Sequence, residues 1–460
     1  MRLITTLLFG ILFATASLAA NDSNDSSVHE VVLENGMKVL VKPDRRAPIV
    51  TSQVWYRVGS SHEPPGLTGI SHALEHMMFK GTESVPAGEF SRIIASHGGE
   101  QNAFTGVDYT AYYQTLAADR LEISLRLEAD RMRNLLLSEE EFLKEIEVVK
   151  EERRLRTEDN PNSLTAERFR AVAYAHNSYR QPVIGWMSDL EAMTVEDLRS
   201  WYRTWYAPNN AILVVVGDVD PAQVVSLAQR YFGDFAAASL PSLKPLQEPP
   251  RLGKSTTRVA APAQQPYLIV GFDVPSLSTA EDAQEVWALD LLSSILDGGS
   301  SARLSRELLR GQQLAVSVGA SYNPFARLST QFSFSGIPVA GVTPAQLKAA
   351  VLEQIARLQQ ELADPAEIAR VQTQVVASKV YELDSVFSQA LQLGLLESIG
   401  LGWPLLDSYL DHLKAVTAEQ VREVAKKYLV EERMTVAILD PLPMDEGQSR
   451  AAQGVDVHAR

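Results

Sequence analysis

An internal repeat constrains the fold of this chain more than any other feature. Residues 194–206 have the pattern of a helix that begins after a threonine, and an apolar strand follows at 211–216. The same order recurs as a helix over 417–428 and a strand over 434–439, at a constant offset of 223 residues (417 − 194). Self-similarity of this kind indicates a duplicated structural unit. We therefore expect two domains of similar fold.

A proline-rich segment separates the two copies. Residues 236–252 contain four prolines, and such a run continues neither a helix nor a central strand. We interpret it as a linker. The predicted divisions are a first domain over 28–235, the linker over 236–252, a homologous second domain over 253–445 and a polar tail over 446–460.

Each half combines strand-like runs with long helical stretches. The predicted strands are 31–41, 50–58, 109–116 and 211–216 in the first half, and 267–272, 316–322, 330–335 and 435–439 in the second. A short turn separates the first two runs, which favours their antiparallel pairing. Blocks of strands followed by blocks of helices indicate an α+β fold. We predict two duplicated α/β-sandwich domains, each an antiparallel or mixed sheet with helices on one face.

The composition restricts the chemistry that these domains can perform. The chain has no cysteine, which excludes disulfides, thiolate metal sites and cysteine nucleophiles. Any metal must therefore be held by His, Asp or Glu. Acidic residues outnumber basic ones by 57 to 42, for a net charge of −15. Because nucleic-acid backbones are bound by clustered cations, nucleic acid is not expected as a partner.

The first 20 residues have the pattern of an export signal peptide. Arg2 precedes an apolar stretch over 3–18, and small residues at 17–20 offer a cleavage site. The alternative is a retained membrane anchor, but the stretch is interrupted by polar residues and is shorter than the roughly 20 apolar residues of a spanning helix. We predict export to the bacterial periplasm, with no stable transmembrane segment after cleavage.

The most informative motif runs from 72 to 76 with the sequence HALEH. On a helix, Ala73 and Leu74 fall on the apolar side while His72, Glu75 and His76 share the other side. Histidines one turn apart can bind a single metal ion. Glu75 lies between them, where it could take a proton from a water molecule at the metal. The alternative is the solvated face of an ordinary amphipathic helix.

A third ligand is needed, because a zinc hydrolase normally uses three protein ligands and keeps a fourth position for water. A helix predicted to begin after Ser138 carries Glu145 and Glu152, seven residues apart on one stripe at the edge of its apolar side. A carboxylate at that edge is costly unless it meets a cation or a metal. We predict Glu152 as the third ligand. We predict that Glu145 contacts a ligand and not the metal itself.

These residues resemble a family signature. His-x-x-Glu-His followed by a glutamate 76 residues after the second histidine (152 − 76) is similar to the inverzincin motif of the pitrilysin/insulinase zinc metallopeptidases. Within that family the chain resembles the mitochondrial processing peptidase β-subunit and its bacterial homologues. Further similar segments are 69–82, 102–105, the pair of glutamates above and 215–218. The resemblance extends over nearly the whole mature chain.

The resemblance implies both an activity and the residues that perform it. His72, His76 and Glu152 would bind one Zn²⁺ per chain, and Glu75 would be the general base. The chain would be a metalloendopeptidase, or a subunit of one, that hydrolyses short or unfolded peptides. Its two domains would form half of a clamshell.

The resemblance also implies a substrate-binding strand. The family segment that matches 102–105 is an edge strand to which the peptide substrate adds by β-augmentation. Asn102, Ala103 and Phe104 would therefore contact the peptide. On the residues alone, the alternative is that Asn102 is a turn residue.

The chain departs from the family in its second half, which has no metal motif. Active members usually contribute an arginine there and, seven residues on, a tyrosine that contact the substrate. Aligned on the segment 313–315, these positions are Leu309 and Val316, whose side chains neither carry charge nor form hydrogen bonds. We therefore predict a sister subunit of the same family that carries the missing pair, with a homodimer as the alternative. Two other functions stay open: a non-catalytic peptide-binding or assembly subunit of the same fold, and a zinc hydrolase with a non-peptide substrate.

Overall fold

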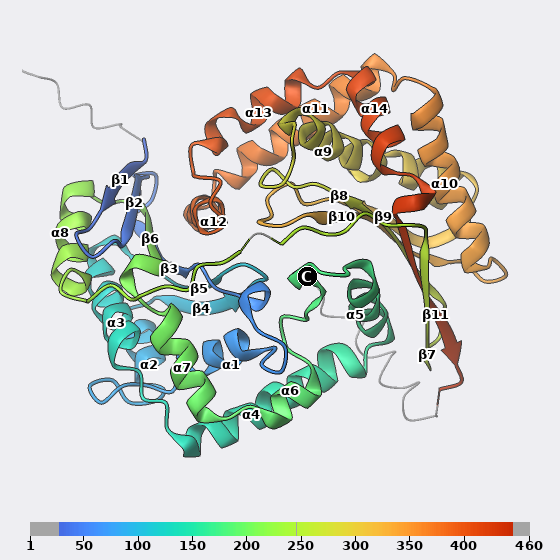
Figure 1. Ribbon diagram of the computed structural model, residues 1–460. Coiled ribbons are helices and arrows are strands. Elements are labelled where there is room, and N and C mark those ends of the chain that lie inside the picture. Colours follow the sequence, from blue (N-terminus) through green and yellow to red (C-terminus); the bar gives the residue numbers. More distant parts are fainter. Residues whose placement is uncertain (1–26, 245, 445–460) are drawn as a thin grey trace, which may run out of the picture.

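Two β-sheets with helices packed on them make up the structure (Figure 1). It is a computed structural model that describes residues 27–244 and 246–444. The predicted export signal over 1–20 and the predicted tail over 446–460 lie outside the described residues.

The first half contains a six-stranded sheet in the order β1-β2-β6-β3-β5-β4. Its strands are β1 (His29–Val32), β2 (Lys38–Pro43), β3 (Ile49–Tyr56), β4 (Glu100–Thr105), β5 (Thr110–Ala117) and β6 (Ala211–Gly217). Its helices are α1 (Ile70–Met77), α2 (Glu89–Ser96), α3 (Leu121–Asn134), α4 (Glu139–Arg153), α5 (Pro161–Ala173), α6 (Met187–Ala192), α7 (Val195–Trp205) and α8 (Pro221–Phe232).

The second half contains a five-stranded sheet in the order β7-β11-β8-β10-β9. Its strands are β7 (Ser255–Pro262), β8 (Tyr267–Val274), β9 (Ala315–Ser321), β10 (Thr330–Pro338) and β11 (Met434–Leu442). Its helices are α9 (Ala283–Asp297), α10 (Pro344–Gln360), α11 (Pro365–Glu382), α12 (Val386–Ser398), α13 (Leu405–Ala415) and α14 (Ala418–Tyr428).

The two sheets share one pairing pattern. In the first, β2 is parallel to β6, and β6, β3, β5 and β4 follow in antiparallel pairs. In the second, β7 is parallel to β11, and β11, β8, β10 and β9 follow in the same way. The prediction of two duplicated α+β domains is confirmed, and β1 is an addition to the first.

The single strand predicted over 31–41 is wrong, because this segment forms the hairpin of β1 and β2. The N–H of Leu33 donates to the carbonyl of Met37 at 2.9 Å and closes the turn. Gly36 has a φ of +88°, a conformation that glycine adopts at little cost. The pair Asn35-Gly36 is a turn signal within an otherwise strand-like run.

The predicted antiparallel pairing of the first two strand-like runs is also wrong. Strand β6 lies between β2 and β3 and pairs with both. All seven residues of β6 are buried, and an apolar strand of this kind is most stable with a neighbour on each edge and cover on both faces. The turn after β2 therefore connects strands that are not neighbours. Strand β7 was not predicted, because it begins with the polar run 255–258.

One helix from each half packs on the sheet of the other half (Figure 1). Helix α12 lies on the first sheet, where Leu393 packs against Trp55. Gly394 permits this approach, since a Cβ there would meet the indole at 2.2 Å. Conversely, α5 lies on the second sheet, where Phe169 packs with Ile269. The structure thus adds a helix on the face of each sheet that the prediction left uncovered.

A buried ion pair joins the two halves next to β4. Asp108, in the turn between β4 and β5, is 2% exposed and accepts hydrogen bonds from Arg327 Nε (3.0 Å) and Ser61 Oγ (2.7 Å). The hydroxyl of Tyr179 also donates to Asp108, and it accepts the N–H of Arg327 at 2.9 Å. Arg327 lies between β9 and β10. Its ion pair with Asp108 therefore joins the second half to the β4–β5 turn of the first half.

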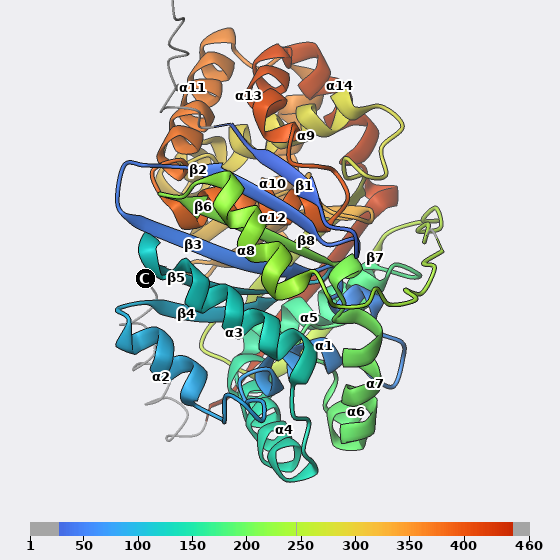
Figure 2. The ribbon, with the colours of Figure 1, turned by 90° about the vertical axis from the view of Figure 1, so that its left-hand side faces the viewer.

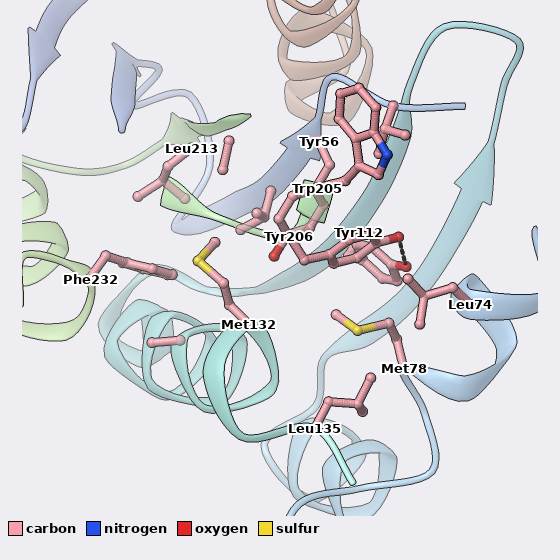
Figure 3. Packing of buried hydrophobic residues seen from close by; sticks show 14 of the residues in the cluster. Tyr56, Leu74, Met78, Tyr112, Met132, Leu135, Trp205, Tyr206, Leu213 and Phe232 are labelled. Atoms are coloured by element: carbon pink, nitrogen blue, oxygen red, sulfur yellow. Dashed lines mark hydrogen bonds between the residues drawn. The ribbon is translucent and has the colours of Figure 1, made fainter. Parts of the chain in front are cut away.

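Helix α1 packs its apolar side into the core of the first half. Figure 3 shows Leu74 beside Tyr112, whose hydroxyl lies 2.9 Å from that of Tyr206. The hydroxyls of Tyr112 and Tyr206 therefore satisfy each other while their rings pack in this core. This packing leaves the polar residues of the segment 72–76 on the opposite side of the helix.

The arrangement of the remaining helices is clear from a second direction. Figure 2 shows α4, α6 and α7 at one end of the molecule and α9, α11, α13 and α14 at the other. None of the described helices combines the length and the apolar composition needed to cross a membrane. The described residues between α8 and β7 form neither helix nor strand.

Candidate metal centre

The start of α1 is fixed by a carboxylate from the preceding loop. Buried Glu63 accepts hydrogen bonds from the backbone N–H groups of Gly69 (2.7 Å) and Ser71 (2.9 Å). Such N–H groups have no partner within a helix. Gly69 has a φ of +86°, and a Cβ there would lie 2.6 Å from the carbonyl oxygen of Ile184. The Glu63 carboxylate and the Gly69 turn thus fix where α1 begins.

Three side chains from α1 and α4 converge on one point. Nε2 of His72 and Nε2 of His76 lie 3.6 and 3.4 Å from Oε2 of Glu152. One ligand atom of each residue lies within 4.8 Å of the other two. Zinc ligands at about 2.0–2.1 Å on a tetrahedron are about 3.4 Å apart. Two imidazoles and one carboxylate at these spacings fit a Zn²⁺ ion.

The imidazole of His76 contacts a carboxylate through the nitrogen that faces away from Glu152. Nδ1 of His76 lies 3.0 Å from Oε1 of Glu145, and Lys80 forms an ion pair with the other oxygen of Glu145. A carboxylate behind a metal-binding histidine fixes the ring orientation and makes Nε2 a better ligand. His72 differs, because its Nδ1 is buried and has no hydrogen-bond partner among the described residues.

The carboxylate of Glu152 is held by a cation. Nη1 of Arg156 lies 2.8 Å from Oε1 of Glu152, which leaves Oε2 turned toward the two histidines. Arg156 belongs to a π-helical turn over Arg154–Glu158 that continues α4. Turns of this type occur frequently at functional sites.

The electrostatics of the three groups favour a bound cation. Burial and the neighbouring imidazole lower the pKa of His72 to about 4, so His72 is neutral at pH 7. Burial alone would lower the pKa of His76, but Glu152 and Glu145 outweigh it and raise that pKa. The hydrogen bond with His76 lowers the pKa of Glu152. The carboxylates therefore stabilise positive charge at this point, either a proton or a metal ion.

Glu75 lies beside this group and faces a cavity. It lines a volume of about 1190 Å³ together with His72, His76 and Glu152. The hydroxyl of Thr105 donates to Oε2 of Glu75 at 2.5 Å. Burial raises the pKa of the Glu75 carboxyl. A buried carboxylate with a raised pKa is a stronger base than an exposed one.

Strand β4 forms a wall of the same cavity. It is the edge strand of the first sheet, and Asn102, Ala103 and Phe104 all line the cavity. Oδ1 of Asn102 accepts the N–H of Ala103 at 2.9 Å, and the Phe104 ring packs 5.4 Å from that of Trp55. The structure thus brings the three residues predicted to bind substrate next to those predicted to bind metal.

The two positions singled out in the second half are not among the residues that line this cavity. Leu309 is partly buried against the core of the second half, in a π-helical segment over Ser305–Gly311. Val316 is 58% exposed on β9, the edge strand of the second sheet. Within the described chain, neither side chain is among the residues around His72, His76 and Glu152.

Arg156 and Thr105 line the cavity and contact Glu152 and Glu75, but the sequence assigned neither a role. Arg156 follows Glu152 by one helical turn, so the i,i+4 spacing of opposite charges could have indicated their ion pair. Thr105 has no such signal, because its contact with Glu75 joins residues 30 positions apart on different elements.

Several known proteins that resemble this chain are named as peptidases. A family model described as insulinase (peptidase family M16) matches residues 38–185, and one described as the peptidase M16 inactive domain matches 192–375. The zinc protease PqqE of Helicobacter pylori is 34% identical over 363 residues, which cover 77% of this chain and 79% of that protein. An uncharacterised zinc protease of Streptomyces coelicolor is 28% identical over 451 residues, 96% of this chain and 95% of that protein. The crystal structure of a protease from Helicobacter pylori superimposes with a TM-score of 0.86 at 29% identity, over 90% of this chain and 100% of that one.

Proposed function

This chain belongs to the insulinase family of peptidases, M16, and on that premise we propose that it is a zinc-dependent endopeptidase, or the zinc-bearing subunit of one, that hydrolyses short or unfolded peptides. One observation carries the proposal. His72, His76 and Glu152 meet at zinc-ligand spacing in the cavity that Glu75 and the edge strand β4 also line. All of these residues lie in the segment matched by the insulinase model rather than in that matched by the inactive-domain model.

The site residues divide the reaction between them. A Zn²⁺ ion held by His72, His76 and Glu152 would polarise the scissile carbonyl and make a bound water easier to deprotonate. Glu75 takes the proton of the attacking water on its carboxylate and passes it to the nitrogen of the leaving amine. The raised pKa of Glu75 suits both steps, because the same group must first accept a proton and then release it.

Strand β4 provides the substrate site. Within the described sheet, β4 pairs only with β5. An extended peptide can therefore pair with its outer N–H and C=O groups once the side chain of Asn102 releases the N–H of Ala103. Pairing through the main chain gives affinity with little sequence preference. The cavity of about 1190 Å³ exceeds the 300–1,000 Å³ or so of small-molecule sites, which suits a peptide segment.

The test is hydrolysis of a quenched fluorescent peptide library by the purified mature chain. We expect cleavage of internal amide bonds, loss of cleavage after chelation, and recovery when Zn²⁺ is restored. Binding of peptide without cleavage in any assembly would instead support a non-catalytic binding subunit. Cleavage that persists in zinc-free protein would overturn the proposal.

We further propose that a sister subunit of the same family completes the active site. By the family resemblance described above, Leu309 and Val316 correspond to the arginine and tyrosine of active members. Neither side chain carries charge or forms hydrogen bonds. A partner that supplies this pair would explain why a chain with a full set of metal ligands lacks it. A homodimer is the alternative.

Restoring the pair within the chain tests this idea directly. The double variant Leu309→Arg, Val316→Tyr places longer polar side chains at these positions, which lie outside the cavity lining. If they reach the substrate, kcat/KM of the isolated chain is expected to rise by about ten-fold or more, since one charge-assisted hydrogen bond in the transition state is worth about that much. The matched control is Leu362→Arg, Val380→Tyr, which places the same side chains at exposed positions elsewhere on the second half. Full activity of the unmodified chain alone, with no gain in the double variant, would reject the partner.

We also propose that residues 1–20 direct export to the bacterial periplasm and are then removed. The apolar stretch of this segment and the small residues at its end support export. Sequencing the N-terminus of the mature protein checks this, with a start soon after Ala20 expected and a start at Met1 against it.

A further inference from the structure

We propose that Thr105 is a positioning residue for the general base, holding one oxygen of Glu75 so that the other faces the attacking water. This inference rests on the proposed peptidase function and deepens it. It assigns to the last residue of the peptide-pairing strand a direct influence on catalysis.

The first support is the geometry of the Glu75 carboxylate. Thr105 Oγ1 donates to Oε2 at 2.5 Å, and no hydrogen bond reaches Oε1 within the described residues. Oε1 is not one of the fully buried atoms that lack a partner. It is therefore accessible, and Glu75 lines the cavity. A hydrogen bond to one oxygen of a carboxylate fixes the rotation of the whole group. Thr105 therefore determines which oxygen is free to take a proton.

The second support is the rigidity of the backbone that carries Thr105. The turn that follows is closed by the N–H of Gly106, which donates to the carbonyl of Tyr109 at 2.8 Å. The N–H of Ser61 donates to Val107 at 2.7 Å. Buried Asp108 then ties the turn to Arg327 of the second half. The hydroxyl of Thr105 is thus presented from a fixed position, which preorganises the base before substrate arrives.

The third support is the double role of β4. Ala103 packs with the core that includes α1, while Phe104 packs on the opposite face against Trp55. Side chains alternate along a strand, so Thr105 shares the α1 side with Ala103 and its hydroxyl can reach Glu75. The backbone of the same strand offers its outer edge to a peptide. One strand therefore aligns both the scissile bond and the base that acts on it.

The test compares Thr105→Val with Thr105→Ser. Valine keeps the branched shape of threonine but removes the hydroxyl, and we expect kcat to fall about ten- to a hundred-fold, as for loss of one hydrogen bond to a charged group. KM and zinc content should stay unchanged, because the β4 backbone and the metal ligands are untouched. Serine restores the hydroxyl and should recover most of kcat. Thr115→Val is the matched control, since Thr115 hydrogen-bonds Thr51 in the same sheet but does not line this cavity.

The possible outcomes separate the inference from the function on which it rests. An inactive wild-type protein in every assembly would overturn the proposed function. An active wild-type protein whose kcat is unchanged in Thr105→Val would overturn the inference alone. A Thr105→Val protein that loses zinc or shows a raised KM would also count against it, because Thr105 would then be merely structural. If the valine variant fails to fold, Thr105→Ala removes the same hydroxyl and is held to the same criteria.

Discussion

Replacing Glu75 by glutamine is expected to lower kcat by about 10²–10⁴-fold, the usual contribution of a general base, while zinc stays bound. Glutamine has nearly the same shape as glutamate, and its amide oxygen can still accept the hydrogen bond from Thr105. It cannot take a proton from water at neutral pH. The proposed metal ligands His72, His76 and Glu152 are unchanged, so the loss concerns proton transfer and not metal binding.

The measurement combines peptide turnover with the metal content of the same sample. Glu147→Gln is a matched control, because Glu147 is an exposed residue of α4 that pairs with Lys150 and does not line the cavity. The control should keep both activity and zinc. If Glu75→Gln turned over peptide at the wild-type rate, another group would have to be the base.

The residues of the candidate site could be predicted because they lie close together in sequence on two helices, α1 and α4. His72, Glu75 and His76 fall on one side of α1 by helical periodicity, and the apolar side of α1 is buried as expected. Glu145 and Glu152 share a stripe of α4 for the same reason, and the structure brings Oε1 of the first to 3.0 Å from Nδ1 of His76. Short-range patterns of this kind specify which side chains face the same way.

The contacts that join distant elements could not be predicted in this way. The position of β6 between β2 and β3 depends on pairing across more than 150 residues of sequence, as in Val39 with Leu213. The exchange of α5 and α12 between the halves depends on close packing at Gly271 and Gly394, where an added Cβ would meet Phe169 and Trp55. Such pairings follow from which buried surfaces fit together, and periodicity along one segment carries no information about them.

Replacing His76 by alanine is expected to abolish zinc binding and peptide hydrolysis together. In the proposed site His76 supplies one of the three donor atoms, and it is also the partner of Glu145 and Glu152. Loss of a group that only supports a ligand typically costs 10–100-fold in metal affinity, so loss of a ligand itself should cost more than about 100-fold. Glu145→Gln should fall in the lower range, because the Nε2 atom of His76 is still present.

Titration of the metal-free proteins with Zn²⁺ against a competing chelator measures the zinc affinity of the wild type and of each variant. Peptide turnover is followed at each step. Excess zinc should restore activity to Glu145→Gln but not to His76→Ala, since only the first keeps a complete donor set. His97→Ala is the matched control, because His97 is an exposed histidine of the first half whose Nδ1 contacts the carbonyl of Ile93. Zinc affinity equal to wild type in His76→Ala would mean that the metal is held elsewhere. The cluster of two imidazoles and Glu152 would then need another explanation, such as a protonated His76 held between two carboxylates.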